Sequence, residues 1–107
     1  MQTVAEIISD ANAALSIYNY YQRLNILNHG THHLKLRLYV RDSLFVQINR
    51  NELASLTNLV LIFKGRRIYG RDEFQGVWHR HPESNPDYHD TSIDGSRPVT
   101  LLGFLKQ

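Results

Sequence analysis

Near the start of the chain, apolar residues recur at steps of three and four positions, which is the period of a helix with one buried side. Thr3 and Glu6 have the spacing of a capping box, in which a hydroxyl and a carboxylate accept hydrogen bonds from free amides of the first turn. We therefore predict a helix within residues 1–18. Its apolar stripe consists of Val4, Ile7, Ile8, Ala11, Ala14 and Leu15.

From position 34 the pattern changes to strict alternation. An apolar residue occupies every second position from Leu34 to Val40 and again from Leu44 to Ile48. Period two is typical of strands with one covered face, and the short turn between the two runs favours an antiparallel hairpin. The stretch before them, 17–27, is rich in tyrosine, isoleucine and leucine and fits either a strand or a helix.

Two more strands are indicated further along. Residues 59–63 form a continuous apolar run, typical of a strand covered on both faces, and 77–81 form a short strand that Pro82 ends. Glycine favours turns, so we expect Gly70 and Gly76 to bracket a turn between them.

The chain after Pro82 differs in character. Residues 83–98 contain almost no apolar side chains, which predicts an exposed, extended segment. The apolar residues 101–105 are expected to dock back onto the core, since they would otherwise face water.

Together these elements predict an α+β fold, with an N-terminal helix packed on a mainly antiparallel sheet of four to six strands and an extended C-terminal segment. The 107 residues suit a single domain, 1–107, divided into a helix (1–18), a sheet (19–81) and the C-terminal segment (82–107).

Composition narrows the chemistry. The chain has no cysteine, which excludes disulfides, iron–sulfur clusters, thiolate zinc sites and cysteine nucleophiles. Mean hydropathy is −0.38, and no apolar run approaches the ~18 residues that span a bilayer. The first residues lack the pattern of a secretory signal. We therefore expect a cytoplasmic protein without membrane contacts.

The formal net charge of +2 is unevenly distributed. Residues 23–80 carry ten basic and four acidic side chains, whereas 1–22 and 81–107 each have a net charge of −2. A basic middle segment can attract a polyanion such as nucleic acid. Lysine and arginine that simply face outward on half-buried strands would produce the same imbalance.

Clustered histidines are the strongest candidate for chemistry. His79 and His81 would share one face of a strand, with Trp78 and Arg80 on the other, and His89 could fold back from the following loop. Such a set suits acid–base catalysis, because imidazole both accepts and donates protons near neutral pH. RNA cleavage needs a base for the 2′-hydroxyl, an acid for the leaving oxygen and a cation for the phosphorane.

Two other interpretations of the histidines stay open. The H-x-H pair could bind a metal ion together with His89, Asp87 or Asp90. Alternatively, the imidazoles could serve structure alone, by hydrogen bonding to loop carbonyls and holding the C-terminal segment in place.

A family resemblance rests on this same region. The runs Leu61–Phe63, Arg67–Asp72, W-H-R-H-P and Pro86–Asp90 resemble the C-terminal half of TumE-like proteins, in similar order and spacing across about residues 34–105. These are small toxin components of bacterial and archaeal toxin–antitoxin pairs. In this chain Arg80 separates the two histidines that the family pattern places side by side.

The resemblance implies a toxin component that a small antitoxin protein neutralises, and the residue types suggest RNA as its target. We assign His79, His81, His89 and Asp72 to a catalytic set that requires no cofactor. The alternatives are a non-enzymatic module that binds nucleic acid or a partner, alone or as a homo-oligomer, and a metal-binding protein that uses the same histidines. The predicted phosphate-binding residues are Arg66, Arg67, Arg71 and Arg80.

Overall fold

A computed structural model of the chain describes residues 2–85 and 87–106. Helix α1 (Val4–Ile17) precedes a six-stranded sheet, and a short helix, α2 (Leu101–Leu105), lies near the C-terminus. The strands are β1 (Arg23–His29), β2 (His33–Arg41), β3 (Leu44–Asn51), β4 (Leu56–Phe63), β5 (Arg66–Phe74) and β6 (Val77–His81). The predicted α+β class is confirmed.

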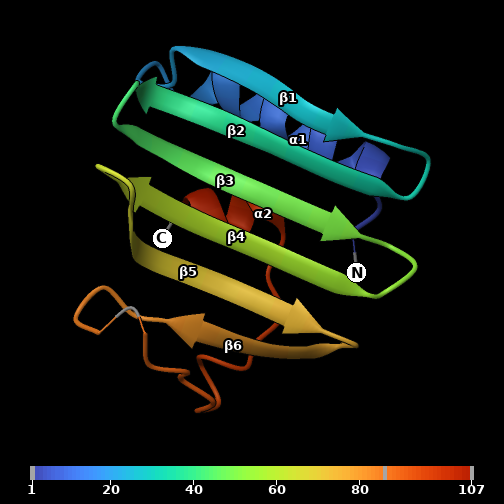
Figure 1. Cartoon of the computed structure of the whole chain (residues 1–107), viewed down its shortest axis with the longest axis vertical. Coiled ribbons are helices and arrows are strands. Elements are labelled where there is room, and N and C mark those ends of the chain that lie inside the picture. Colours follow the sequence, from blue (N-terminus) through green and yellow to red (C-terminus); the bar gives the residue numbers. More distant parts are fainter. Residues whose placement is uncertain (1, 86, 107) are drawn as a thin grey trace.

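All neighbouring strands are antiparallel, and their order in the sheet is their order in the chain, β1 to β6. Figure 1 shows both helices on the same side of this sheet, with the segment after β6 returning beside the last strand. The fold therefore has two layers. One sheet face is covered by helices. On the opposite face, which we call the open face, the described residues form no helix.

The core lies between the helices and the covered face. Leu36, Ile48 and Leu59 occupy matching register positions on β2, β3 and β4 and are almost fully buried. Ile7 and Ala11 of α1 pack against this layer, and so do Leu101 and Phe104 of α2. Because side chains alternate along a strand, the residues between these core positions point to the open face.

The predicted capping box begins α1. The hydroxyl of Thr3 accepts a hydrogen bond from the amide of Glu6 at 3.1 Å, and the Glu6 carboxylate accepts one from the amide of Thr3 at 2.8 Å. The helix places Val4, Ile7, Ala11 and Ala14 against the core, as the apolar spacing predicts. No helix in the described part of the chain has the length and apolar character required to cross a membrane.

The structure resolves one ambiguous stretch and corrects two of the sequence-based expectations. The ambiguous stretch 17–27 contains the end of α1 and the start of strand β1. The C-terminal segment is not extended throughout, because residues 101–105 form α2. Gly70 does not bracket a turn but lies within β5, where a Cβ atom would come 3.2 Å from the carbonyl oxygen of Leu59. The turn belongs to Gly76, whose φ is +85°.

Candidate active site

Strands β5 and β6 bring the predicted histidines to the open face. His79 is in register with Asp72, and His81 with Gly70. The residues that alternate with them, Arg71 and Arg80, pair on the covered face. The side chains of Asp72, His79 and His81 therefore gather at one edge of the open face.

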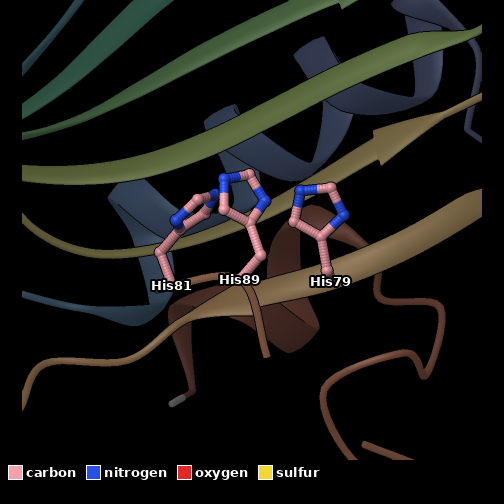
Figure 2. Close-up of side chains that lie close together, drawn as sticks. All are labelled: His79, His81 and His89. Atoms are coloured by element: carbon pink, nitrogen blue, oxygen red, sulfur yellow. The ribbon is translucent and has the colours of Figure 1, made fainter. Parts of the chain in front are cut away.

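His89 joins this group through a short extension of the sheet. The amide and carbonyl of Asp90 both hydrogen bond to the backbone of Arg80, at 2.8 and 3.1 Å, which places His89 beside His81. The His89 ring centre lies 4.6 Å from that of His79 and 4.5 Å from that of His81. Figure 2 shows the three rings side by side and pointing the same way.

Asp72 holds the buried member of the cluster. Its Oδ2 atom lies 2.7 Å from Nε2 of His81 and 3.6 Å from Nε2 of His79. The other carboxylate oxygen has a partner on β4, because the Asn58 amide, oriented with its nitrogen toward Asp72, donates to Oδ1 at 2.9 Å. This arrangement fixes the carboxylate and thereby orients the imidazole of His81.

The three imidazoles differ in their access to solvent. His81 is only 1% exposed, His79 is partly exposed, and His89 is exposed. Burial lowers the pKa of His79, the positive charges that His89 and His81 can carry lower it further, and Asp72 opposes this shift. A neutral His79 at physiological pH is the chemical state that a general base requires.

The same cluster could hold a metal ion. One nitrogen from each of the three histidines lies within 4.8 Å of the others, and this group contains neither Asp87 nor Asp90. Zinc binds histidine nitrogen at ~2.0–2.1 Å in tetrahedral geometry, which brings ligand nitrogens to about 3.3 Å from one another. Separations of up to 4.8 Å between the nitrogens would have to shorten by up to about 1.5 Å to enclose such an ion, so the donor set fits zinc after the rings move together.

The predicted phosphate-binding arginines are not part of this cluster. Arg71 is 3% exposed on the covered face, where it donates to the backbone carbonyl of Arg97. Arg66 and Arg67 are exposed at the opposite end of β5. The alternation of side chains accounts for the position of Arg71, because a residue next to Asp72 in a strand must point to the other face.

Arg80 also points away from the histidines, and it pairs with Asp90. Its Nε atom donates to the Asp90 carboxylate at 2.9 Å. Hydrogen bonds from Ser92 and Arg80 lower the pKa of Asp90 to about 2, and the pair raises the pKa of Arg80. The side chain and the backbone of Arg80 both hydrogen bond to Asp90 and hold the segment that carries His89. Arg80 therefore positions His89 from the covered face of the sheet.

A buried ion pair lies below the site and has no evident signature in the sequence. The Nη1 atom of Arg50 lies 3.5 Å from Oε1 of Glu73, and both residues are buried on the covered face. Thr57, Ser55 and the amide of Gly76 all donate to the Glu73 carboxylate. This network ties the β5–β6 turn to β3 and β4, and thus supports the strands that carry Asp72 and His79.

A separate hollow lies on the covered face. It has a volume of about 680 Å³ and is lined by apolar and aromatic residues that include Tyr20, Tyr69 and Phe104. The histidines do not line it. Glu83 and Lys106 also line it. We place the candidate active site at the histidine cluster, because three imidazoles and a carboxylate converge there, which bears more directly on chemistry than a mainly apolar hollow.

Comparisons of this chain with family models, with curated proteins and with solved structures found no match.

Proposed function

We propose that this protein cleaves RNA by histidine acid–base catalysis, and that it acts as a TumE-like toxin component. The observation that carries the proposal is the cluster itself, in which His81, oriented by Asp72, packs against two more accessible imidazoles. The exposure of His79 and His89 on the open face would allow one phosphodiester to contact both rings.

The chemistry divides between these two accessible imidazoles. Neutral His79 accepts the proton of the ribose 2′-hydroxyl, and the 2′-oxygen attacks the adjacent phosphorus. Protonated His89 donates its proton to the leaving 5′-oxygen as the P–O5′ bond breaks, and its positive charge stabilises the phosphorane. The products are a 2′,3′-cyclic phosphate and a free 5′-hydroxyl. His81 touches both rings and acts as a positioning residue.

The biological setting follows from the resemblance to TumE-like proteins. RNA cleavage in the cell would arrest growth, and a small antitoxin protein would neutralise the chain. Regulated expression in a bacterial host tests this, with growth followed alongside sequencing of RNA fragments that carry 5′-hydroxyl ends. We expect arrest and new 5′-hydroxyl ends with the natural sequence, and neither with His79→Gln produced at the same level.

A matched control removes a histidine outside the cluster and so tests whether the loss of activity is specific to the site. His29 is exposed on β1, far along the sheet from β6, and His29→Gln should arrest growth like the natural sequence. Arrest that persists unchanged in folded His79→Gln would contradict the proposed mechanism.

Metal binding is the second candidate function, favoured by the separation of at most 4.8 Å between the three ligand nitrogens. Elemental analysis of the purified protein distinguishes the two. About one equivalent of a transition metal, lost in His79→Gln and needed for RNA cleavage, would favour the metal site. Cleavage that continues at full rate after exhaustive chelation would favour acid–base catalysis without a metal.

A further inference from the structure

We propose that the open face of the sheet binds single-stranded RNA across β1, β2 and β3 and leads it to the histidines at β6. The inference names the substrate class of the proposed ribonuclease and rests on that function only for where cleavage occurs. Binding itself depends on residues of β1, β2 and β3 and can be measured without cleavage.

The open face is basic. The strand register places Arg23, Lys35, Arg37 and Arg67 at its outward positions, because they alternate with buried residues such as Leu36 and Leu38. Among the outward strand positions that the structure describes, Asp72 carries a carboxylate, and it engages His81. Asp42, in the turn between β2 and β3, pairs with Arg23 at 2.9 Å, so the unpaired charge of this face comes mainly from Lys35, Arg37 and Arg67. Phosphate groups would be attracted to such a surface.

Two arginines on this face are held over aromatic rings. The guanidinium of Arg23 lies 4.0 Å from the ring centre of Tyr39, and that of Arg37 lies 4.4 Å from the ring centre of Phe45. The two rings are themselves 5.0 Å apart. Arginine fixed in this way offers both charge for phosphate and a flat surface on which an unpaired base can stack.

Hydrogen bonds further restrict Arg37. Its Nε atom donates to the side-chain oxygen of Gln47 at 3.0 Å, and its Nη1 atom donates to the hydroxyl of Tyr39 at 3.2 Å. A side chain that is already ordered loses less conformational freedom when a ligand binds. The side chain of Arg37 is therefore preorganised for binding.

Polar amides connect the basic strands to the histidines. Gln47 and Asn49 on β3 and Asn58 on β4 occupy outward positions between β2 and β5. At a strand spacing of about 4.8 Å, the distance from β2 to β6 is about 19 Å. A strand of roughly six stacked nucleotides, at 3.4 Å each, covers that distance.

The stacking surfaces favour a single strand over a duplex. Bases in a duplex are stacked on one another and cannot lie on Arg23 or Arg37, whereas unpaired bases can. An acidic protein would be attracted to the same charges but would gain nothing from base stacking. A duplex and an acidic polymer are therefore the competing ligands to measure.

Fluorescence anisotropy with a labelled 2′-O-methyl oligonucleotide measures binding in isolation, because this RNA has no free 2′-hydroxyl and cannot be cleaved. A length of about 12 nucleotides lies within the range of known single-strand sites. The double variant Lys35→Gln/Arg37→Gln should bind about tenfold more weakly, and its dependence of log Kd on log salt should fall by about 1.4 for two lost phosphate contacts.

The matched control is Arg97→Gln/Lys106→Gln, which removes the same charge from exposed residues of the C-terminal segment. It should bind like the natural protein. Equal weakening by both double variants would overturn the proposal, as would equal affinity for a duplex of the same sequence or for poly-glutamate of matched charge. The natural protein gives both readouts. Binding of the uncleavable oligonucleotide without cleavage of unmodified RNA would be a failure of the proposed chemistry and would leave this surface standing.

Discussion

Asp72 and His81 lie on neighbouring strands and are joined by a 2.7 Å contact between Oδ2 and Nε2, although Asp72 is in register with His79. The position directly opposite His81 on β5 is Gly70, and the carboxylate of Asp72 reaches His81 diagonally past this glycine. Because glycine has no side chain, nothing from that position obstructs the contact. The result is a buried, oriented imidazole beneath two accessible ones.

This relationship predicts the effect of Asp72→Asn. An amide carries no charge and can turn its nitrogen toward the ring, so the imidazole of His81 should change its tautomer or orientation while the fold persists. We expect RNA cleavage to fall about tenfold in kcat with little change in KM, which is less than the ~10²–10⁴-fold expected on loss of a proton-transferring group. Nitrogen NMR shifts of His81 report the change directly, and identical shifts in the variant would contradict the assigned role.

The hydrogen-bonded carboxylate of Asp90 predicts a pH dependence of stability. The pKa of Asp90 is lowered from its ordinary value of 3.8 to about 2, chiefly by Ser92 and also by Arg80. A lowered carboxyl pKa stabilises the fold above the unfolded value, and this contribution is lost as the pH falls toward the folded value. The stability difference between the natural protein and Asp90→Asn should therefore be constant at neutral pH and shrink between about pH 4 and pH 2.

Urea unfolding at a series of pH values measures this difference. Asp87→Asn, at an exposed position in the same segment, is the matched control and should show no comparable trend. A difference between Asp90→Asn and the natural protein that grows on acidification would contradict the lowered pKa of Asp90.

The buried ion pair predicts a large loss of stability in Glu73→Gln. Arg50 would keep its charge in a site that lacks a full counter-charge, and breaking one side of a buried pair costs about 3–5 kcal/mol. For a domain with about 5–15 kcal/mol of total stability, such a loss shows clearly in urea unfolding. The exposed Glu83→Gln should change the free energy of unfolding by less than about 0.5 kcal/mol. Equal values for the two variants would show that Arg50 and Glu73 do not depend on each other.

The docking of helix α2 predicts that a buried and an exposed apolar residue differ in their contribution to the free energy of unfolding. Phe104 is buried against the core and its ring lies 5.6 Å from that of Tyr69, so Phe104→Ala should lower the free energy of unfolding by about 3–5 kcal/mol. Leu53 is 81% exposed, and Leu53→Ala should have little effect. If Phe104→Ala proves as mild as Leu53→Ala, the C-terminal residues do not dock as described.

The outlines of the fold were predictable because its periodic signals are strong. The capping box at Thr3 and the alternation in 34–48 each fit only one kind of element, and each is confirmed. Short or mixed stretches were harder. The tyrosine-rich residues of 17–27 suit either conformation, and five residues at 101–105 are too few to display a helical period. At Gly70, local turn preference was overridden by the close approach of the Leu59 backbone.

The candidate site was partly predictable for the same reason. Strand alternation placed His79 and His81 together, but His89 depends on a non-local backbone bridge between Arg80 and Asp90. Alternation also indicates that Arg71 and Arg80 do not bind phosphate beside the histidines, because adjacent residues of a strand point to opposite faces. Pairs such as Arg50–Glu73 form through contacts between strands and leave no spacing pattern in the sequence.

The most direct test of the central claim is single-turnover cleavage of a DNA oligonucleotide that contains one ribonucleotide. We predict a 2′,3′-cyclic phosphate at that nucleotide with the natural protein and with the control His29→Gln/His32→Gln. His79→Gln/His89→Gln should be slower by at least about 10²-fold while retaining its circular dichroism spectrum. Equal rates for the two double variants, or cleavage at positions without a 2′-hydroxyl, would contradict the proposed acid–base mechanism.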